Sequence, residues 1–243
     1  MDQTLLAQLP DYPAIEAGYR RMWAAGRPEL MAGAVTPDPV PDDSSMRWGV
    51  SIVAHFDPVF AGQLETLAAQ GREWCDENHT FYNAGNLHTT VRSCEFFRRE
   101  IARADPRMEI YRRSLAEVCR QCGPFEIACS GLNGNHTGII CQGYPVGPSL
   151  QQLRRSLHQK FMDHGVQHGP EATRPRLSAH VSLTVFGGPL KSPRALAGWI
   201  ESQRRLDVGV ARISHLTLVR YHRTLHDVVP VAVSVFALGG STL

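Results

Sequence analysis

The hydrophobic residues follow two periods along the chain, and each period predicts one kind of element. Helical patterns predict helices over 58–74, 107–121, 148–163 and 192–204. Apolar runs and alternation of polar and apolar residues predict strands over Arg47 to Phe56, around His88 and His180, and over 125–132, 137–144, 211–221 and 228–238. The turn Asn133-Gly134-Asn135 between two such runs is a strong hairpin signal.

The predicted elements occur twice in the same order. A strand with a histidine, a helix and a hairpin follow one another from His88 to Tyr144, and the same series runs from His180 to Leu238. This order is a degenerate internal repeat, visible in the elements and not in residue identity. Strands that alternate with helices, with a hairpin closing each unit, predict an α+β fold of two antiparallel sheets that face each other.

The first 33 residues predict a separate helical arm. Its apolar side chains stand near helical spacing after Pro13, namely Ile15, Tyr19, Met22 and Trp23. Residues 34–45 form a linker rich in proline, aspartate and serine, which is unsuited to regular packing. We therefore divide the chain into a helical arm with its linker (1–45) and a two-lobed domain (46–243). The arm can cover a cleft, pack on the back of the domain or mediate dimers, and the sequence does not choose.

Both histidine strands carry a hydroxyl two residues after the histidine. The first reads Asn86-Leu87-His88-Thr89-Thr90-Val91, and the second reads Ala179-His180-Val181-Ser182-Leu183-Thr184. Because side chains two apart on a strand share a face, His88 lies with Thr90, and His180 lies with Ser182. The apolar residues of the second strand point the other way, which predicts one packed face and one face that lines a cleft. Arg92 adds a positive charge to the polar face of the first strand.

Other histidines need a separate interpretation. His215-Leu216-Thr217 and His222-Arg223-Thr224 fit the same bare spacing. His215 corresponds by position to the strand 125–132 of the first unit, so we interpret it as structural, and we interpret His222 as part of a solvated basic turn. His164 and His168 have the spacing of metal ligands on a helix, but Gly165 and the lack of a third ligand favour a loop. We expect no metal and no cofactor.

The two motifs resemble the paired His-x-Thr/Ser motifs of the 2H phosphoesterase superfamily, which includes bacterial RNA 2′,3′-cyclic phosphodiesterases and related RNA-end enzymes. The resemblance covers roughly Trp48 to the C-terminus. It implies two similar lobes that each give one motif strand to a central cleft, and cleavage of phosphodiesters without a metal. Two positions depart from the family pattern, because Thr89 stands where an apolar residue is usual and Ala179 where proline is frequent.

The chemistry of such a cleft assigns a role to each motif residue. Hydrolysis of a cyclic phosphodiester needs a base for water, an acid for the leaving oxygen, and donors for the charge on the phosphoryl oxygens. Histidine suits both proton roles because its unperturbed pKa is about 6.5. We assign His180 as the base and His88 as the acid, and Thr90 and Ser182 as hydrogen-bond donors to the phosphate.

The substrate is predicted less sharply than the chemistry. Aromatic side chains near the motif strands and hairpin ends either stack on a base or belong to the core, namely Tyr82, Tyr144, Phe186 and Tyr221. Arginines that either contact phosphate or stay solvated are Arg92, Arg174 and Arg176. The leading prediction is a 2′,3′-cyclic phosphate of RNA or of a nucleotide, which the resemblance implies is opened to a 2′-phosphate. A specialised small molecule, a cyclic dinucleotide, an end-joining reaction and non-catalytic binding of a nucleotide or RNA remain alternatives.

Composition narrows these alternatives only slightly. The chain has 243 residues, enough for one large domain or two small lobes. A net charge of +2 and a pI near 8.3 lie below the pI of about 9 that marks a nucleic-acid-binding domain, so small phosphorylated substrates fit as well as RNA. No apolar run approaches the roughly 18 residues of a membrane span, so we expect a cytoplasmic protein with no membrane partner. Its richness in arginine and alanine is typical of a high-GC bacterial genome.

Overall fold

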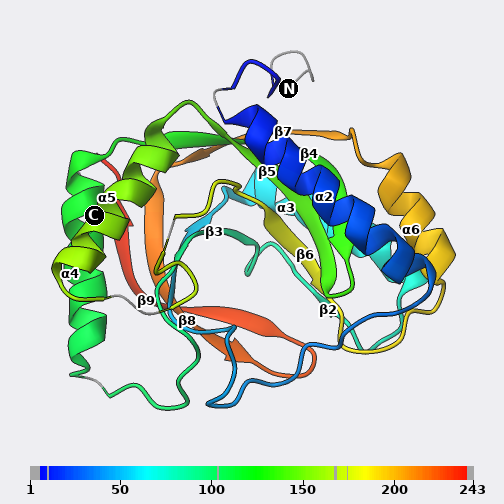
Figure 1. Cartoon of the computed structure of the whole chain (residues 1–243), viewed down its shortest axis with the longest axis horizontal. Coiled ribbons are helices and arrows are strands. Elements are labelled where there is room, and N and C mark those ends of the chain that lie inside the picture. The colour runs from blue at the N-terminus through cyan, green and yellow to red at the C-terminus, as the bar shows by residue number, and fades with distance from the viewer. Residues whose placement is uncertain (1–5, 10, 103, 167–168, 174, 240–243) are drawn as a thin grey trace.

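The computed structural model describes residues 6–9, 11–102, 104–166, 169–173 and 175–239, and Figure 1 gives the arrangement of its elements. The helices are α2 (Tyr12–Met31), α3 (Pro58–Gln70), α4 (Pro106–Gln121), α5 (Ser149–Asp163) and α6 (Pro193–Ser202), with a short 3₁₀ helix η1 (Gly71–Trp74). The strands are β1 (Ser51–His55), β2 (Thr80–Phe81), β3 (His88–Ser93), β4 (Phe125–Asn135), β5 (Gly138–Val146), β6 (Val181–Val185), β7 (Asp207–Ile213), β8 (His215–Arg223) and β9 (Val228–Ala237).

Aspartate followed by proline starts two of the helices. The Asp57 carboxylate accepts hydrogen bonds from the amides of Val59 and Phe60 at the start of α3, and Asp105 caps α4 in the same way. These caps satisfy amides that have no partner inside the helix, and proline fits the first turn because its missing N–H is not needed there. The predicted helix boundaries therefore hold to within a few residues, with the last turn of 58–74 formed by η1.

All neighbouring strands pair antiparallel in the order β7-β4-β5-β6-β3-β1-β8-β9, and β2 pairs with β6. This confirms the predicted α+β fold with antiparallel pairing. The two halves of the order, β7 to β6 and β3 to β9, are joined by β3 and β6 through the single residue pair Thr89 and Val181. The two motif strands are thus neighbours at the centre of one hydrogen-bonded sheet. The sequence had predicted two separate sheets.

The strand predicted over Arg47 to Phe56 is shorter in the structure. Strand β1 begins only at Ser51, because Trp48 has a φ of 65° that an extended strand does not allow. The predicted turn at Asn133 and Gly134 is also displaced. Both residues lie inside β4, and the turn falls at residues 136–137, where the Asn135 side chain accepts from the amide and the hydroxyl of Thr137.

The last hairpin is divided among three strands. The stretch predicted as one strand over 211–221 is interrupted at Ser214, so that β7 pairs with β4 while β8 pairs with β1 and β9. The chain therefore passes from one half of the sheet to the other between β7 and β8. The basic stretch 220–223, predicted as a turn, belongs to β8.

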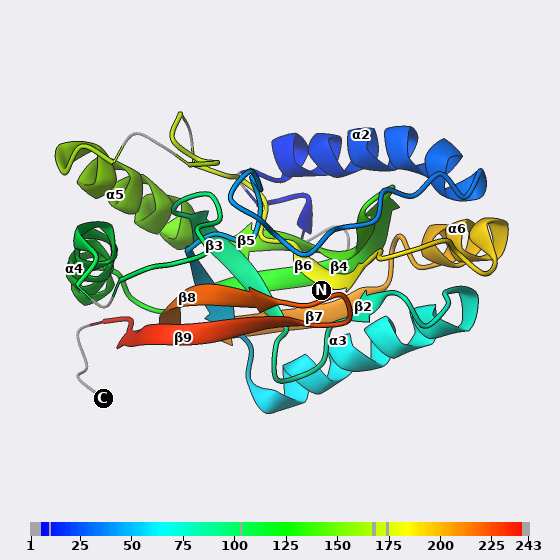
Figure 2. The same ribbon diagram turned by 90° about the horizontal axis from the view of Figure 1, so that it is seen from below.

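The N-terminal helix α2 packs on the same face of the sheet as the second motif. Ile140 of β5 pairs with Ser182 of β6, and residues paired in this way point to the same face. Ile140 contacts the apolar cluster that contains Ile15 and Tyr19 of α2. Figure 2 shows α2 on one side of the sheet and α3 on the other. The arm therefore covers the part of this face that lies over β4 and β5.

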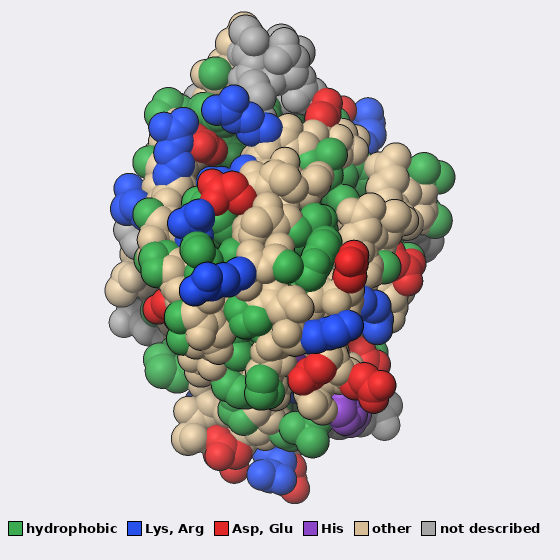
Figure 3. All heavy atoms as spheres, turned by 90° about the vertical axis from the view of Figure 1, so that its right-hand side faces the viewer, with side chains coloured by type: hydrophobic (Ala, Val, Ile, Leu, Met, Phe, Trp, Pro, Cys, Tyr) green, Lys and Arg blue, Asp and Glu red, His purple; other side chains and the backbone are tan. Residues whose placement is uncertain are grey.

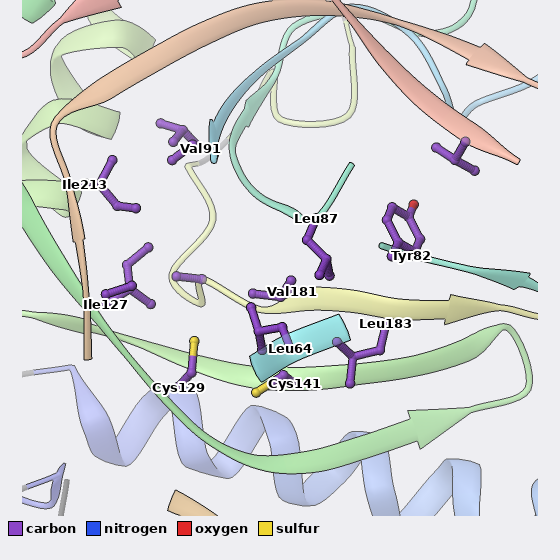
Figure 4. Close-up of a cluster of buried hydrophobic side chains, with 14 of the residues drawn as sticks. Leu64, Tyr82, Leu87, Val91, Ile127, Cys129, Cys141, Val181, Leu183 and Ile213 are labelled. Carbon is purple, nitrogen blue, oxygen red and sulfur yellow. The ribbon is translucent and has the colours of Figure 1, made fainter. Parts of the chain in front are cut away.

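The opposite face of the motif strands is packed, as their alternation predicted. Val181 and Leu183 of β6 are fully buried and lie near Leu64 of α3 (Figure 4). Burying each such side chain contributes about 1.5 to 3 kcal/mol. This packing holds β6 with its polar side chains turned away from α3.

The surface carries charges of both signs. On the face shown in Figure 3, basic and acidic side chains are interspersed among apolar ones. Among the described residues, none of the helices is both long enough and apolar enough to cross a membrane.

Candidate active site

Both histidine motifs open onto one cavity of about 270 Å³. Strand β3 contributes His88 and Thr90 to its wall, while His180 and Ser182 come from the start of β6. Because β3 and β6 are neighbours in the sheet, two motifs that are far apart in sequence meet in space. The two motifs therefore lie around one cavity, as the repeat predicted.

Hydrogen bonds determine which nitrogen of His88 faces the cavity. Nδ1 lies 2.8 Å from the carbonyl oxygen of Asn86, and because a carbonyl only accepts, Nδ1 carries the hydrogen. In the neutral ring Nε2 is then an acceptor, and the Tyr221 hydroxyl donates to it across 3.0 Å. Burial, with smaller contributions from His55 and Arg176, lowers the pKa of His88 to about 4 against the opposing effect of the Asn86 hydrogen bond.

His180 lies among more positive charges than His88. Burial, together with smaller contributions from Arg176, Arg154, His88 and Arg47 that repel the imidazolium, lowers its pKa to about 3. Both rings are therefore neutral at neutral pH, each with one nitrogen able to take a proton.

Arginine side chains supply positive charge at the cavity wall. Arg47 and Arg176 both line it. Arg176 is held by its Nε, which donates to Glu171 across 2.9 Å, and its Nη2 donates to the Ser93 hydroxyl across 3.4 Å. A fixed guanidinium beside two imidazoles and two hydroxyls is a suitable environment for a phosphate.

A third arginine joins the two motifs from behind. Arg154 of α5 is 1% exposed and donates to five carbonyl oxygens. Two belong to β3 (Thr90 and Val91), and three belong to the segment before His180 (Arg176, Leu177 and Ser178). These carbonyls lie where β3 and β6 have little direct pairing, so the guanidinium replaces the missing sheet hydrogen bonds.

Besides Thr90 and Ser182, three of the side chains predicted to contact substrate line the cavity, namely Tyr82, Tyr221 and Arg176. Tyr82 lies with its ring centroid 6.0 Å from that of His88, and Arg176 is the only one of the three predicted arginines to line it among the described residues. Arg174, like the candidate metal ligand His168, lies outside the described residues.

Arg92 points away from the cavity, contrary to the prediction that it shares a face with His88. The pairing of β1 with β3 shifts its register between Ile52, which faces Arg92, and Val53, which faces Thr90. This bulge reverses the alternation, so Ser93 lines the cavity instead. The Arg92 guanidinium lies over the ring of Phe161 at 4.8 Å.

Two predicted aromatic residues also lie outside this cavity. The Tyr144 hydroxyl donates to Glu16 across 2.8 Å, and its ring packs against Tyr12 and Tyr19 of the N-terminal arm. Phe186 is fully buried and packs edge-on against His79. Tyr144 and Phe186 therefore belong to the packed interior, which was one of the two alternatives that the sequence left open for them.

The sequence also left several cavity residues without a role. Ser51, Ser93, Arg47 and Trp48 line the wall. Tyr221 was predicted as a stacking or core aromatic residue, but its hydrogen bond to His88, 133 residues away, was not predicted. The only local signal was at Arg154, where a charged residue falls on the apolar side of α5 together with Leu150, Leu153 and Leu157. His215 and His164 do not line the cavity. In the part of the chain that the structure describes, no group of three or more His, Cys, Asp or Glu residues could hold a metal ion.

Comparison with known proteins identifies the fold. No family model matches the sequence, and no curated protein sequence matches it either. Among solved structures, TT0787 of Thermus thermophilus aligns with a TM-score of 0.61 at 15% identity, over 80% of this chain and 100% of that one. E. coli LigT in its apo form aligns with a TM-score of 0.51 at 13% identity, over 80% of this chain and 99% of that one.

These likenesses define a class by fold. The present chain has the α+β fold of LigT and TT0787.

Proposed function

We propose that the protein is a metal-independent phosphodiesterase that opens a 2′,3′-cyclic phosphate of RNA or of a nucleotide to a 2′-phosphate. The observation that carries this proposal is the meeting of His88 and His180, each with a hydroxyl two residues on, around one cavity. Binding alone needs positive charge and donors, whereas two imidazoles at one cavity can supply the proton transfers of hydrolysis.

The reaction consumes one water and balances its protons between the two rings. The neutral His180 takes a proton from water as the water oxygen forms a bond to phosphorus. The bond from phosphorus to the 3′ oxygen breaks, and protonated His88 gives its proton to that oxygen. Thr90 and Ser182 donate to the non-bridging oxygens, and Arg176 offsets their charge. Proton exchange with solvent then returns His180 to its neutral form and His88 to its protonated form.

The environments of the two rings support this division of roles. A bound phosphodiester anion raises the pKa of both imidazoles, since it stabilises the imidazolium form. Fewer cations act on His88 than on His180, so His88 is the ring that takes up a proton when the anion binds. His180 then remains neutral as the base. Two groups with different pKa values in one site are the usual arrangement for an acid and a base.

Nucleotide complexes of a protein with this fold support the substrate class. E. coli LigT has been crystallised with 3′-AMP, in a structure that aligns with a TM-score of 0.51 at 13% identity, and with ATP. The aromatic ring of Tyr82 and the arginines of the present cavity offer the contacts that a nucleotide needs.

Turnover of a 2′,3′-cyclic mononucleotide with a chelator present tests the proposal. We expect His88→Ala and His180→Ala each to lower kcat by about 10²- to 10⁴-fold, the usual contribution of a general acid or base. His215→Ala is the matched control, because His215 has the same spacing to a threonine but is exposed on β8 and lies outside the cavity. Near-full activity of either motif variant contradicts the proposal.

A further inference from the structure

A separate cavity of about 800 Å³ lies between the N-terminal arm and the rest of the chain. Helix α2 forms one side of it, and the other side is formed by β5 and by the segment that joins α6 to β7. None of its lining residues lines the cavity that holds the two histidines. Its volume falls within the roughly 300 to 1,000 Å³ of ordinary ligand sites.

Aromatic side chains line this arm cavity along the length of the helix. Tyr12 and Trp23 lie about 16 Å apart along the axis of α2, at a rise of about 1.5 Å per residue. Tyr144 of β5 also lines the cavity, and its ring packs against that of Tyr12 with 5.3 Å between centroids. Because the Tyr12 side chain is only partly buried, part of its ring is open to a planar group in the cavity.

The charged side chains of the arm cavity leave an excess of positive charge. Three arginines against one glutamate give a net charge of +2. The glutamate is Glu16, which accepts from Nε of Arg20 across 2.8 Å. Arg204 and Arg205 form no salt bridge in the part of the chain that the structure describes, and Glu16 and Glu201 act on Arg204 only at longer range. This balance favours a ligand with two negative charges.

Arg204 is the least exposed of the three arginines. Its guanidinium lies over the ring of Trp23 at 5.2 Å, and burial lowers the pKa of the group. Its Nη1 is buried and has no hydrogen-bond partner among the described residues. A buried N–H of a charged group without an acceptor is destabilising, and a negative charge in the cavity offsets this effect. The position therefore suits an anion beside Trp23.

We propose that the arm cavity binds a phosphomonoester that carries a planar ring, at a site separate from the two histidines. The doubly charged phosphate contacts Arg204 and Arg205, because the fork of N–H groups on a guanidinium matches phosphate oxygens. The ring lies along α2 toward Tyr12. A nucleoside monophosphate is the simplest ligand of this class, and a carboxylate with a planar ring shares only part of its chemistry.

Titration calorimetry with adenosine 5′-monophosphate tests the class of ligand. Adenosine lacks the phosphate, inorganic phosphate lacks the ring, and indole-3-acetate replaces the phosphate with a carboxylate. We expect the monophosphate to bind about tenfold more tightly than each of these, since hydrogen bonds to charged groups and stacking both contribute. Equal or tighter binding of any of the three overturns the assigned class.

Substitutions test whether the binding occurs in the arm cavity. We expect Arg204→Gln and Arg205→Gln each to weaken binding of adenosine 5′-monophosphate by about tenfold. Arg205 is exposed, so its variant is expected to fold even if Arg204→Gln does not. Arg21→Gln is the matched control, because Arg21 is an exposed arginine of α2 outside the cavity. Unchanged affinity in Arg205→Gln, or an equal loss in the control, overturns the site.

Photolabelling distinguishes the arm cavity from the histidine cavity. An azido derivative of adenosine 5′-monophosphate is cross-linked to the full chain, and the labelled peptides are identified by mass spectrometry. We expect label on the peptides that contain Tyr12 or Trp23, and its loss when unmodified monophosphate is added in excess. Label confined to the peptides of His88 and His180 overturns the site. This outcome does not depend on the proposed hydrolysis.

Discussion

At the scale of the residue, the two histidines are held neutral at a cost in acid stability. The folded protein lowers the pKa of His88 to about 4 and of His180 to about 3, mainly by burial, while both titrate near 6.5 when unfolded. Between these values the unfolded chain binds more protons than the folded one. Stability therefore falls as the pH decreases from about 6.5 toward about 3.

Replacing His180 removes its share of this pH dependence. Between pH 6.5 and pH 4 the free energy of unfolding falls in the wild type, and we expect it to fall by about 3 kcal/mol less in His180→Asn. Each unit of pKa shift corresponds to about 1.4 kcal/mol. Urea unfolding at several pH values measures the slope. His215→Asn, at an exposed position, is expected to keep the wild-type slope. An identical slope in His180→Asn contradicts the lowered pKa.

The residue scale also sets the limit of prediction from sequence. His88, Thr90, His180 and Ser182 were predictable because spacing of two on a strand determines which side chains share a face. Arg92 was placed wrongly because the bulge in β3 depends on how β1 pairs with it. Tyr221 reaches His88 across 133 positions, and no local pattern records such a contact.

At the scale of the element, α5 connects the two motif strands. Strands β3 and β6 share the one pair Thr89 and Val181, and Arg154 of α5 bonds to carbonyl groups on both sides of this junction. The relative position of the two histidines therefore depends on a buried guanidinium as well as on the sheet.

Removing this guanidinium is expected to destabilise the fold. We predict that Arg154→Leu lowers the free energy of unfolding by about 3 to 5 kcal/mol, because buried carbonyl groups lose their donors. Arg155→Leu is the matched control, since Arg155 is the next residue of the same helix and is exposed. Urea midpoints compare the two variants. Equal midpoints for the variants mean that Arg154 does not bridge the strands.

Elements were predictable where their signals are local. Asp-Pro pairs start α3 and α4, and both helices begin within about one residue of the predicted positions. The late start of β1 and the division between β7 and β8 were not predictable, because strand ends depend on partners far away in sequence. Strand β7 stops where its pairing with β4 ends, and β8 continues beside β1.

At the scale of the whole molecule, the N-terminal arm is part of the folded core. Trp23 and Leu30 of α2 belong to the main apolar cluster together with strands of both halves of the sheet. The Tyr19 hydroxyl donates to the carbonyl of Gly143 and accepts from its amide. The sequence left three roles open for the arm, and the structure places it on the face of the sheet that carries the second motif, over β4 and β5.

The arm and the sheet are therefore expected to unfold together. We predict that Trp23→Ala lowers the free energy of unfolding by about 3 to 5 kcal/mol, the usual cost of such a truncation in a core. Arg21→Ala, an exposed position on the same helix, is the control. Thermal unfolding followed by circular dichroism is expected to remain a single transition. A separate early transition for helix α2 contradicts a shared core.

The central claim is that His180 as the base and His88 as the acid, from the two halves of one sheet, together hydrolyse a cyclic phosphodiester. Phosphorus NMR of the product from a 2′,3′-cyclic nucleotide, with a chelator present, tests this most directly. We expect the wild type to form a single 2′-phosphomonoester, and His88→Ala and His180→Ala to form it about 10²- to 10⁴-fold more slowly. A 3′-phosphomonoester as the product, or near-full rates in either variant, contradicts this claim.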